Sequence, residues 1–310
     1  MTAAMTDTNH ADGTPPAGAS LDVAFLGLGV MGYPMAGHLA RVGHRVAVYN
    51  RTVAKAEQWC AEHRGRPGAT AAQAARGARI VFSCVGNDND LREIVLGSDG
   101  AFAGMSEGAI LMDHTTASAQ LARELHSEAR RRGLHFVDAP VSGGQAGAQK
   151  GQLTVMCGGD REAFGPAQAV AQAFARAVTL IGPSGSGQLA KMVNQLCIAG
   201  LVQGLAEGIE FGCRAKLDME LVLKVISQGA AQSWQMENRG TTMVQDRFDF
   251  GFAVDWMRKD LGLCLDEARR NGCALPAAAL IDQFYAEIQA MGGGRWDTSS
   301  LIRRLRRAHK

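Results

Sequence analysis

The spacing of apolar and polar residues changes near residue 182. Before it, short apolar runs alternate with stretches whose apolar residues recur every three or four positions. The runs predict strands at "LDVAFLGLG", "HRVAVYN", "ARIVFSCV", "AILMDHT", "LHFVDAPV", "LTVMCGG" and "AVTLIG". Strands that alternate with helices are typical of βαβ units. The sequence therefore predicts an α/β domain with a doubly wound, mostly parallel sheet over residues 21–182.

The chain after this point has helical periodicity almost throughout. "GPSGSG" predicts a loop, and the five helical segments after it include "MELVLKVISQG" and "AVDWMRKDLGLCLDEARRNG". We therefore expect an all-α domain over residues 183–310. The first twenty residues are polar and small, without the basic start and apolar core of a secretion signal, and we expect residues 1–20 to be disordered.

Composition and charge narrow the possible partners. The chain has 310 residues, 46% of them hydrophobic, and its formal net charge of +2 is too weak to favour nucleic acid as the main partner. The segment around Lys191 comes closest to a membrane span, but its polar residues and glycines favour a soluble helix, so we expect no membrane partner. Seven scattered cysteines without a C-x-x-C pair predict reduced thiols, a cytoplasmic location and no metal site.

A glycine pattern follows the first expected strand. "GLGVMG" places Gly27, Gly29 and Gly32 in the G-x-G-x-x-G spacing, with Val30 and Met31 between the second and third glycines. The context of strand, glycine loop and helix is typical of a Rossmann-type dinucleotide site, where the second glycine lets the backbone approach a pyrophosphate at the helix N-terminus. The loop predicts binding of a nicotinamide dinucleotide by these five residues.

The end of the second expected strand carries information about the cofactor. An acidic residue there holds the ribose 2′-hydroxyl of NAD, whereas arginine accommodates the 2′-phosphate of NADP. This chain has Asn50, Arg51 and Thr52, with no carboxylate to repel a phosphate. The three residues favour NADP over NAD. Stacking of Arg51 on the adenine would allow either cofactor.

A single charge interrupts the long apolar segment "GQLAKMVNQLCIAGLVQG". A helix that is apolar on every side is normally buried, and a buried ammonium is unfavourable unless it is paired or used. Lys191, Asn194 and Gln195 lie at i, i+3 and i+4 and share one face. Burial lowers the pKa of a lysine towards the working pH, so Lys191 is predicted to be a general acid and base. The alternative is a lysine that reaches solvent from a surface helix.

A second polar stretch follows an expected strand at "VSGG". Gly143 and Gly144 let the backbone come close to a ligand, and their N–H groups with the Ser142 hydroxyl predict an anion-binding turn for a substrate carboxylate. The alternative is a plain turn between a strand and a helix.

Four motifs in order resemble the β-hydroxyacid dehydrogenases, a family that includes 3-hydroxyisobutyrate dehydrogenase, tartronate semialdehyde (2-hydroxy-3-oxopropionate) reductase and glyoxylate/succinic semialdehyde reductases. They are "GLGVMGYPMAGHLARVGHRVAVYNRT", "DAPVSGGQAGAQKGQLTVMCGG", "GQLAKMVNQ" and "WMRKDLGLCLDEA". The resemblance covers roughly residues 21–300. It implies a Rossmann domain joined by a long helix to an all-helical domain, and a homodimer or homotetramer.

The resemblance also assigns roles to individual residues. It implies that Lys191 is catalytic with Asn194 beside it, and that Ser142, Gly143 and Gly144 hold the substrate carboxylate. Gln195 stands where the family often has asparagine and is placed with the substrate-binding residues. Val85, Thr116 and Lys259 are placed with the cofactor. The implied activity is the NAD(P)-dependent interconversion of a small β-hydroxy carboxylate and its semialdehyde.

Other interpretations remain open. Taken by itself, the Lys259–Asp260 pair favours a solvated helix face. Asp113 and His114 are interpreted as structural, and Ser233, Trp234 and Gln235 either line the far end of a pocket or, for Trp234, belong to the core. Decarboxylating 6-phosphogluconate dehydrogenase is disfavoured because Asn194 stands where that family has histidine. Imine reductases usually lack the lysine. A dinucleotide-binding sensor would be expected to lose Lys191 or the Ser142–Gly144 turn.

Overall fold

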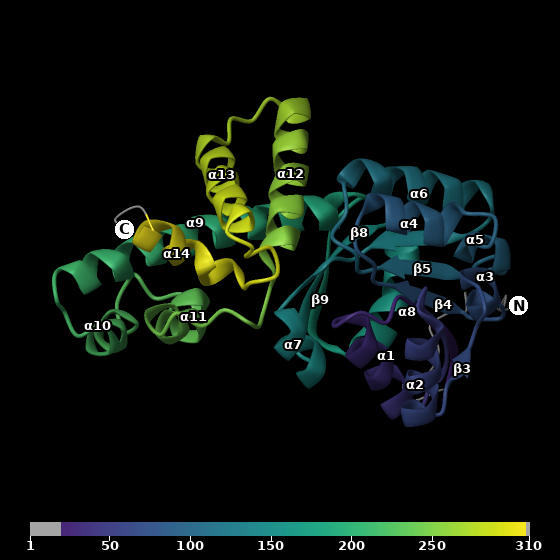
Figure 1. The fold of residues 1–310 in the computed structure, drawn as a ribbon. Coiled ribbons are helices and arrows are strands. Elements are labelled where there is room, and N and C mark those ends of the chain that lie inside the picture. The colour runs from purple at the N-terminus through teal and green to yellow at the C-terminus, as the bar shows by residue number, and fades with distance from the viewer. Residues whose placement is uncertain (1–19, 308–310) are drawn as a thin grey trace, which may run out of the picture.

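The computed structural model describes residues 20–307, with a sheet at one end and a group of helices at the other (Figure 1). The strands are β1 (Asp22–Leu26), β2 (Arg45–Tyr49), β3 (Arg66–Pro67), β4 (Ile80–Ser83), β5 (Ile110–Asp113), β6 (His135–Asp138), β7 (Val141–Ser142), β8 (Leu153–Gly159) and β9 (Ala175–Gly182). The helices around them are α1 (Gly32–Arg41), α2 (Val53–His63), α3 (Ala71–Ala75), α4 (Asp88–Leu96), α5 (Ala101–Gly104), α6 (Ala119–Arg131), α7 (Gly144–Lys150) and α8 (Arg161–Ala171).

The rest of the described chain is helical. Its elements are α9 (Ser186–Arg214), α10 (Met219–Ile226), α11 (Trp234–Val244), α12 (Val254–Asn271), α13 (Pro276–Ala290), the short 3-10 helix η1 (Thr298–Ser300) and α14 (Leu301–Arg307). The expectation of disorder before residue 20 falls on residues 1–19, outside the described part.

The sheet confirms the expected α/β class, with one difference in strand direction. Its order is β3-β2-β1-β4-β5-β6-β8-β7, with β9 also paired to β8. The pairs from β3 to β6 are parallel, but β8 runs antiparallel to both β6 and β7. β6 and β7 follow each other along β8: Val137 and Asp138 pair with Gly159 and Gly158, and Val141 and Ser142 pair with Val155 and Thr154. The chain then returns through the seven-residue helix α7 and enters β8 in the opposite direction.

Alternating residues of β1 divide the core between the two faces of the sheet. Val23 and Phe25 join the cluster beneath α1, α2 and α8, whereas Ala24 and Leu26 join the cluster beneath α3 and α6. All four side chains are essentially inaccessible to solvent. The sheet is therefore covered on both sides, as parallel sheets are.

The order of strands creates a switch point beside β1. β1 pairs with β2 on one side and with β4 on the other. The chain first adds β2 and β3 on one side of β1, and then returns to add β4 and β5 on the other side. Leu26 is level with Tyr49 and Ser83, so these strands end at the same edge. Ligands of open α/β sheets bind outside the carboxyl ends of the strands at such a point.

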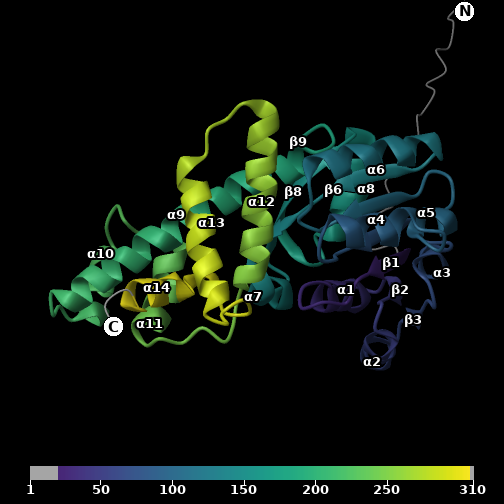
Figure 2. The ribbon, with the colours of Figure 1, turned by 45° about the horizontal axis from the view of Figure 1, so that its top comes forward.

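Helix α9 is fixed to the sheet at its first turn. The Asp138 carboxylate accepts hydrogen bonds from the backbone N–H groups of Gly185 (2.7 Å) and Gln188 (3.0 Å). Gly187 is needed here, because a Cβ at this position would lie 2.4 Å from the Met156 carbonyl oxygen. From this anchor the 29-residue helix runs away from the sheet and forms the spine of the helical part (Figures 1 and 2).

The expectation that α9 is buried on every side is wrong for the single chain. One side packs against α11, α12, α13 and α14. The other side exposes Val193 (62%), Leu201 (45%) and Phe211 (74%), because no other element of the described chain covers it. In the described part, α9 is the helix long and apolar enough to span a membrane, and about 33% of its most apolar window is buried within the fold.

Candidate active site

The glycine loop lies between β1 and α1 at the switch point. Gly27 has φ +96°, and a Cβ there would lie 2.4 Å from the Cys84 carbonyl oxygen. A Cβ on Gly32 would lie 2.0 Å from the Gly27 carbonyl oxygen, so this glycine lets α1 pack closely on the strand. The first glycine thus serves the turn and the third serves helix packing.

The second glycine has a different environment. A Cβ on Gly29 would meet no heavy atom within 4 Å, and the neighbouring Val30 is 66% exposed, whereas Met31 packs against the core. Helix α1 begins without a side-chain cap and has no acidic residue in its first turn. Its first N–H groups and the open backbone at Gly29 therefore fit the pyrophosphate of a dinucleotide.

Asn50, at the end of β2, holds the glycine loop. Its Oδ1 accepts a hydrogen bond from the backbone N–H of Leu28 (2.9 Å), and its Nδ2 donates to the Thr52 carbonyl (3.0 Å). Arg51 points to solvent with 88% of its side chain exposed and makes an ion pair of 3.3 Å with Asp90. An exposed pair of this kind is weak, so the guanidinium of Arg51 is free to turn to a phosphate.

The loops after β4 and β5 lie at the same carboxyl edge of the sheet as the glycine loop. The backbone N–H of Val85 donates to Thr115 Oγ1 (3.0 Å), and the Thr116 carbonyl accepts a hydrogen bond from Lys259 Nζ. Gln188, from the first turn of α9, donates to the Thr115 carbonyl (2.8 Å) and accepts from the Ala117 N–H (3.0 Å). Gln188 was not singled out in the sequence, because an amide between apolar residues gives no sign of the loop that it will meet.

Asp113 and His114 make hydrogen bonds to other residues of the sheet domain. Asp113 Oδ1 accepts from the hydroxyls of Ser83 and Thr115 (2.7 Å each), and burial raises the pKa of Asp113 to about 7. His114 Nδ1 donates to the Ala139 carbonyl (2.7 Å), and its ring stacks on Phe82. Burial lowers the pKa of His114 to about 4, so the imidazole stays neutral. These contacts are those of structural groups.

Lys191 lies on the side of α9 that faces α12. Its side chain is 7% exposed, so the lysine does not reach solvent as a surface lysine would. Desolvation lowers its pKa to about 8. Attraction by Asp260 opposes this effect, and repulsion by Lys259 adds to it. A buried lysine with such a pKa can donate and accept a proton near neutral pH.

Lys191, Asn194 and Gln195 form what we call the lysine face of α9. Asn194 connects this face to the "VSGG" turn. Its Oδ1 accepts a hydrogen bond from Ser142 Oγ (3.4 Å), and its Nδ2 donates to Gln195 Oε1 (2.8 Å). Gly143 and Gly144 follow Ser142 with φ values of +124° and +60°. Two successive residues in this region require glycine, and they turn the backbone beside the hydroxyl.

His38 holds the helix that follows this turn. Its Nδ1 faces the Arg41 guanidinium (2.7 Å), which is a donor, so Nε2 carries the proton. Nε2 then donates to the carbonyls of Ala148 (3.0 Å) and Gln149 (3.1 Å) at the end of α7. The cofactor helix α1 and the Ser142–Gly144 turn are thereby joined.

The interpretation of Lys259 and Asp260 as a solvated pair is wrong. Asp260 is 2% exposed and lies 3.1 Å from Lys259 Nζ. It also accepts a hydrogen bond of 2.6 Å from Gln195 Nε2. Sequence reasoning underrated Asp260 because its buried position follows from the packing of α12 on α9, which no local pattern shows.

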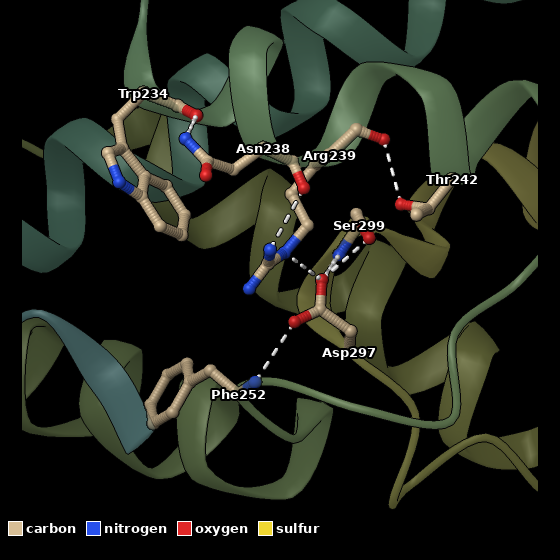
Figure 3. Close-up of polar contacts among 7 residues, drawn as sticks. All are labelled: Trp234, Asn238, Arg239, Thr242, Phe252, Asp297 and Ser299. Atoms are coloured by element: carbon tan, nitrogen blue, oxygen red, sulfur yellow. Dashed lines mark hydrogen bonds and ion pairs between the residues drawn. The ribbon is translucent and has the colours of Figure 1, made fainter. Parts of the chain in front are cut away.

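Trp234 is not a core residue. It is 52% exposed, and the guanidinium of Arg239 lies 4.9 Å from its ring centre. Arg239 Nε donates to Asp297 (3.1 Å), which also accepts from the Phe252 N–H (Figure 3). Ser233 begins α11 by accepting from the Met236 N–H, and Gln235 is buried behind it. This cluster ties α11 to the segments before α12 and α14.

The fold and site define a nicotinamide dinucleotide-binding oxidoreductase. Residues 22–182 match the family model described as the NAD-binding domain of 6-phosphogluconate dehydrogenase. Residues 185–305 match the one described as NAD-binding of NADP-dependent 3-hydroxyisobutyrate dehydrogenase. The chain therefore belongs to the 3-hydroxyisobutyrate dehydrogenase family, the β-hydroxyacid dehydrogenases, whose members include tartronate semialdehyde reductases. It is an NAD(P)-dependent oxidoreductase that acts on hydroxyl groups of small molecules.

Three similar proteins illustrate the family. An uncharacterized oxidoreductase of Shewanella frigidimarina is 62% identical, over 92% of this chain and 98% of its own length. The 2-hydroxy-3-oxopropionate reductase of Escherichia coli is 30% identical, over 92% and 97%. The structure of Mycobacterium tuberculosis 3-hydroxyisobutyrate dehydrogenase with L-serine is 29% identical, with a TM-score of 0.84 over 93% of this chain and 100% of that one.

Proposed function

We propose that the protein interconverts a small β-hydroxy carboxylate and its semialdehyde, with Lys191 as general acid and base. The observation that carries this proposal is the burial of Lys191 beside Asn194 and Asp260, with a pKa lowered to about 8. The 2-hydroxy-3-oxopropionate reductase and 3-hydroxyisobutyrate dehydrogenase reactions fit this site best. Glyoxylate or succinic semialdehyde reduction is the alternative within the same family.

The proton step follows from the position of Lys191. A bound nicotinamide supplies or accepts the hydride. During reduction, the ammonium of Lys191 hydrogen-bonds the substrate carbonyl oxygen and stabilises the negative charge that develops there. It then transfers its proton to that oxygen. In the oxidative direction the neutral amine accepts the hydroxyl proton, and Asn194 orients the same oxygen.

The substrate carboxylate is assigned to the turn at Ser142–Gly144. The Ser142 hydroxyl and the N–H groups of the two glycines supply neutral donors for an anion. A Cβ on Gly144 would meet no heavy atom within 4 Å, which leaves room for a ligand at this backbone. The hydrogen bond between Ser142 and Asn194 is long, at 3.4 Å, so the hydroxyl can turn to a carboxylate without losing a strong partner.

The residues at the end of β2 favour NADP over NAD in this proposal. Arg51 is exposed and held only by the Asp90 pair, so it can bind the 2′-phosphate as a charge-assisted donor. Gly27, Gly29, Val30, Met31 and Gly32 are assigned to the pyrophosphate side. Val85, Thr116 and Lys259 are assigned to the nicotinamide side.

The exposed apolar side of α9 supports a homodimer or homotetramer. Gly200, Gly204 and Gly208 lie one helical turn apart on α9, and a Cβ on any of them would meet no heavy atom within 4 Å. Large apolar side chains at both ends of this stretch are exposed as well. We assign this surface to contact with a second copy, and the assembled enzyme to the cytoplasm.

The experiment is a spectrophotometric assay with purified protein. NADPH and NADH are tested separately against tartronate semialdehyde, methylmalonate semialdehyde, succinic semialdehyde and glyoxylate, with Lys191→Met as the control variant. Oxidation of NADPH that depends on Lys191 is the expected result. A protein that binds NADPH but oxidises it with none of the four would contradict the proposed substrate class.

A further inference from the structure

A continuous series of polar contacts passes close to Lys191 and crosses between the two parts of the molecule. It begins at Ser142 and passes through Asn194 and Gln195 on α9. It continues through Asp260 and Lys259 on α12, and ends at the Thr116 carbonyl. The series connects the turn assigned to the substrate with the loop assigned to the nicotinamide.

Gln195 is the residue that joins the two helices in this series. It is 2% exposed. Its Oε1 accepts from Asn194 (2.8 Å), and its Nε2 donates to Asp260 Oδ2 (2.6 Å). Both ends of the amide are therefore engaged by protein groups. This arrangement differs from a direct substrate contact, which would need one end to be available.

The two bonds fix the orientation of Asn194 and of the Asp260 carboxylate. The Gln195 Oε1 accepts the hydrogen bond from Asn194 Nδ2. Because the Nδ2 is used in this bond, the Oδ1 of Asn194 is the atom that faces the Ser142 hydroxyl. The bond to Asp260 holds one carboxylate oxygen towards α9, while the other lies 3.1 Å from Lys259. The Asp260 carboxylate is thereby held between Gln195 and Lys259, and its charge acts on the nearby Lys191.

We propose that Gln195 is a positioning residue, which holds the Asp260 carboxylate near Lys191 and orients Asn194 for the substrate. This inference rests on the proposed function of Lys191. The charged and titratable groups that act on Lys191 are Asp260, Lys259 and Cys264, all on α12. Asp138, on β6, is bonded to the backbone at the start of α9. Asp260 is the one carboxylate among the three, so its position sets the attraction that opposes the desolvation of the Lys191 ammonium.

The first variant is Gln195→Leu, which keeps the volume and removes both hydrogen bonds. The carboxylate of Asp260 then keeps only Lys259, on its own helix, and its attraction for Lys191 weakens. The apolar side chain adds desolvation, and both effects lower the pKa of Lys191. We expect that pKa to fall by at least about 0.5, and kcat to fall about tenfold with substrate KM within about twofold.

The matched control is Gln203→Leu. Gln203 lies further along α9, is 7% exposed, and donates to the Glu207 carboxylate (2.6 Å). The substitution thus removes a similar amide–carboxylate bond from the same helix, away from Lys191. We expect wild-type kcat and an unchanged Lys191 pKa. Equal effects of the two substitutions on kcat and on this pKa would overturn the proposal.

A second variant keeps the test valid if Gln195→Leu does not fold. In Gln195→Glu, the protonated carboxyl group donates to Asp260 as the amide does, whereas the ionised group repels it. Activity is therefore expected at acidic pH and lost as the pH rises through the titration of the introduced group. A pH profile identical to that of the wild type would contradict the proposal.

Lysine-selective ¹⁵N NMR follows the titration of Lys191 Nζ without any substrate. A shift in Gln195→Leu that is missing in Gln203→Leu supports the positioning role even if no tested semialdehyde is reduced. Failure of the proposed function and failure of this inference are therefore separate results.

Discussion

The glycine loop and the lysine face of α9 are built in opposite ways. The loop is formed by backbone within one strand–turn–helix unit. Gly27 is required by its positive φ and Gly32 by the lack of space for a Cβ, whereas Gly29 leaves its backbone open. The site at the lysine face is formed by side chains of α9 and α12 and by the Thr116 carbonyl in the loop after β5, which meet only after the helical part has packed. Cofactor binding and proton transfer should therefore respond to different kinds of substitution.

Substitution of Lys191 should show the largest difference between the effect on catalysis and the effect on cofactor binding. Lys191→Met removes the proton donor but keeps an unbranched side chain in the buried site. We expect kcat to fall by about a thousandfold, because general acid–base catalysis contributes on this order, while the Kd for NADPH stays within about threefold. Steady-state kinetics and cofactor fluorescence measure the two quantities, with Lys224→Met on the exposed side of α10 as the control. A fall in cofactor affinity equal to the fall in kcat would show that the two regions are not separate.

Two substitutions within the glycine loop test the backbone argument. Gly32→Ala places a Cβ 2.0 Å from the Gly27 carbonyl oxygen, so both thermal stability and cofactor binding should fall. Gly29→Ala has open space and no positive φ, so the fold should keep the wild-type Tm while NADPH binding weakens by about tenfold or more. Thermal unfolding with and without NADPH distinguishes the two. Equal losses of Tm would contradict the different roles of these glycines.

The preference for NADP over NAD is tested at Arg51, the exposed residue that follows β2. Arg51→Ala should weaken NADPH binding by about tenfold, because a charge-assisted pair with the 2′-phosphate is lost, and leave NADH within about twofold. Binding of both cofactors is measured by fluorescence titration. The same loss for NADPH and NADH would assign Arg51 to adenine stacking instead.

The smallest expected effect is at the Ser142–Gly144 turn, which is assigned to the substrate carboxylate. Ser142→Ala removes one neutral donor and leaves the two glycine N–H groups, so the KM for the acid substrate should rise about fivefold with little change in kcat. Gln152→Ala, in the turn after α7, serves as a nearby control. An unchanged KM would place the carboxylate elsewhere.

The contrast between the regions also explains what the sequence could predict. The roles of Gly27 and Gly32, the α/β order and the span of α2 follow from local patterns, because turns and periodicity are local properties. Strands β3 and β7 are two residues long and held only by their partners, so no periodicity marks them. Helix α11 mixes polar and small residues, and the sequence did not single it out.

The side-chain network was harder to predict. Lys191 was noticed because a charge in an apolar helix is unusual. Gln188, Gln195 and Asp260 have ordinary sequence surroundings, and their roles depend on which element packs opposite them. The exposed side of α9 shows the same limit, since composition indicates an apolar helix but not what covers it.

The most direct test of the central claim is the pH dependence of kcat for the accepted substrate in both directions. Reduction needs the ammonium form of Lys191 and oxidation needs the neutral amine, and burial lowers the pKa of this lysine to about 8. We therefore predict that kcat for reduction falls, and kcat for oxidation rises, as the pH passes through about 8. The same pH profile in both directions, or wild-type profiles in Lys191→Met, would contradict the assignment of the proton to Lys191.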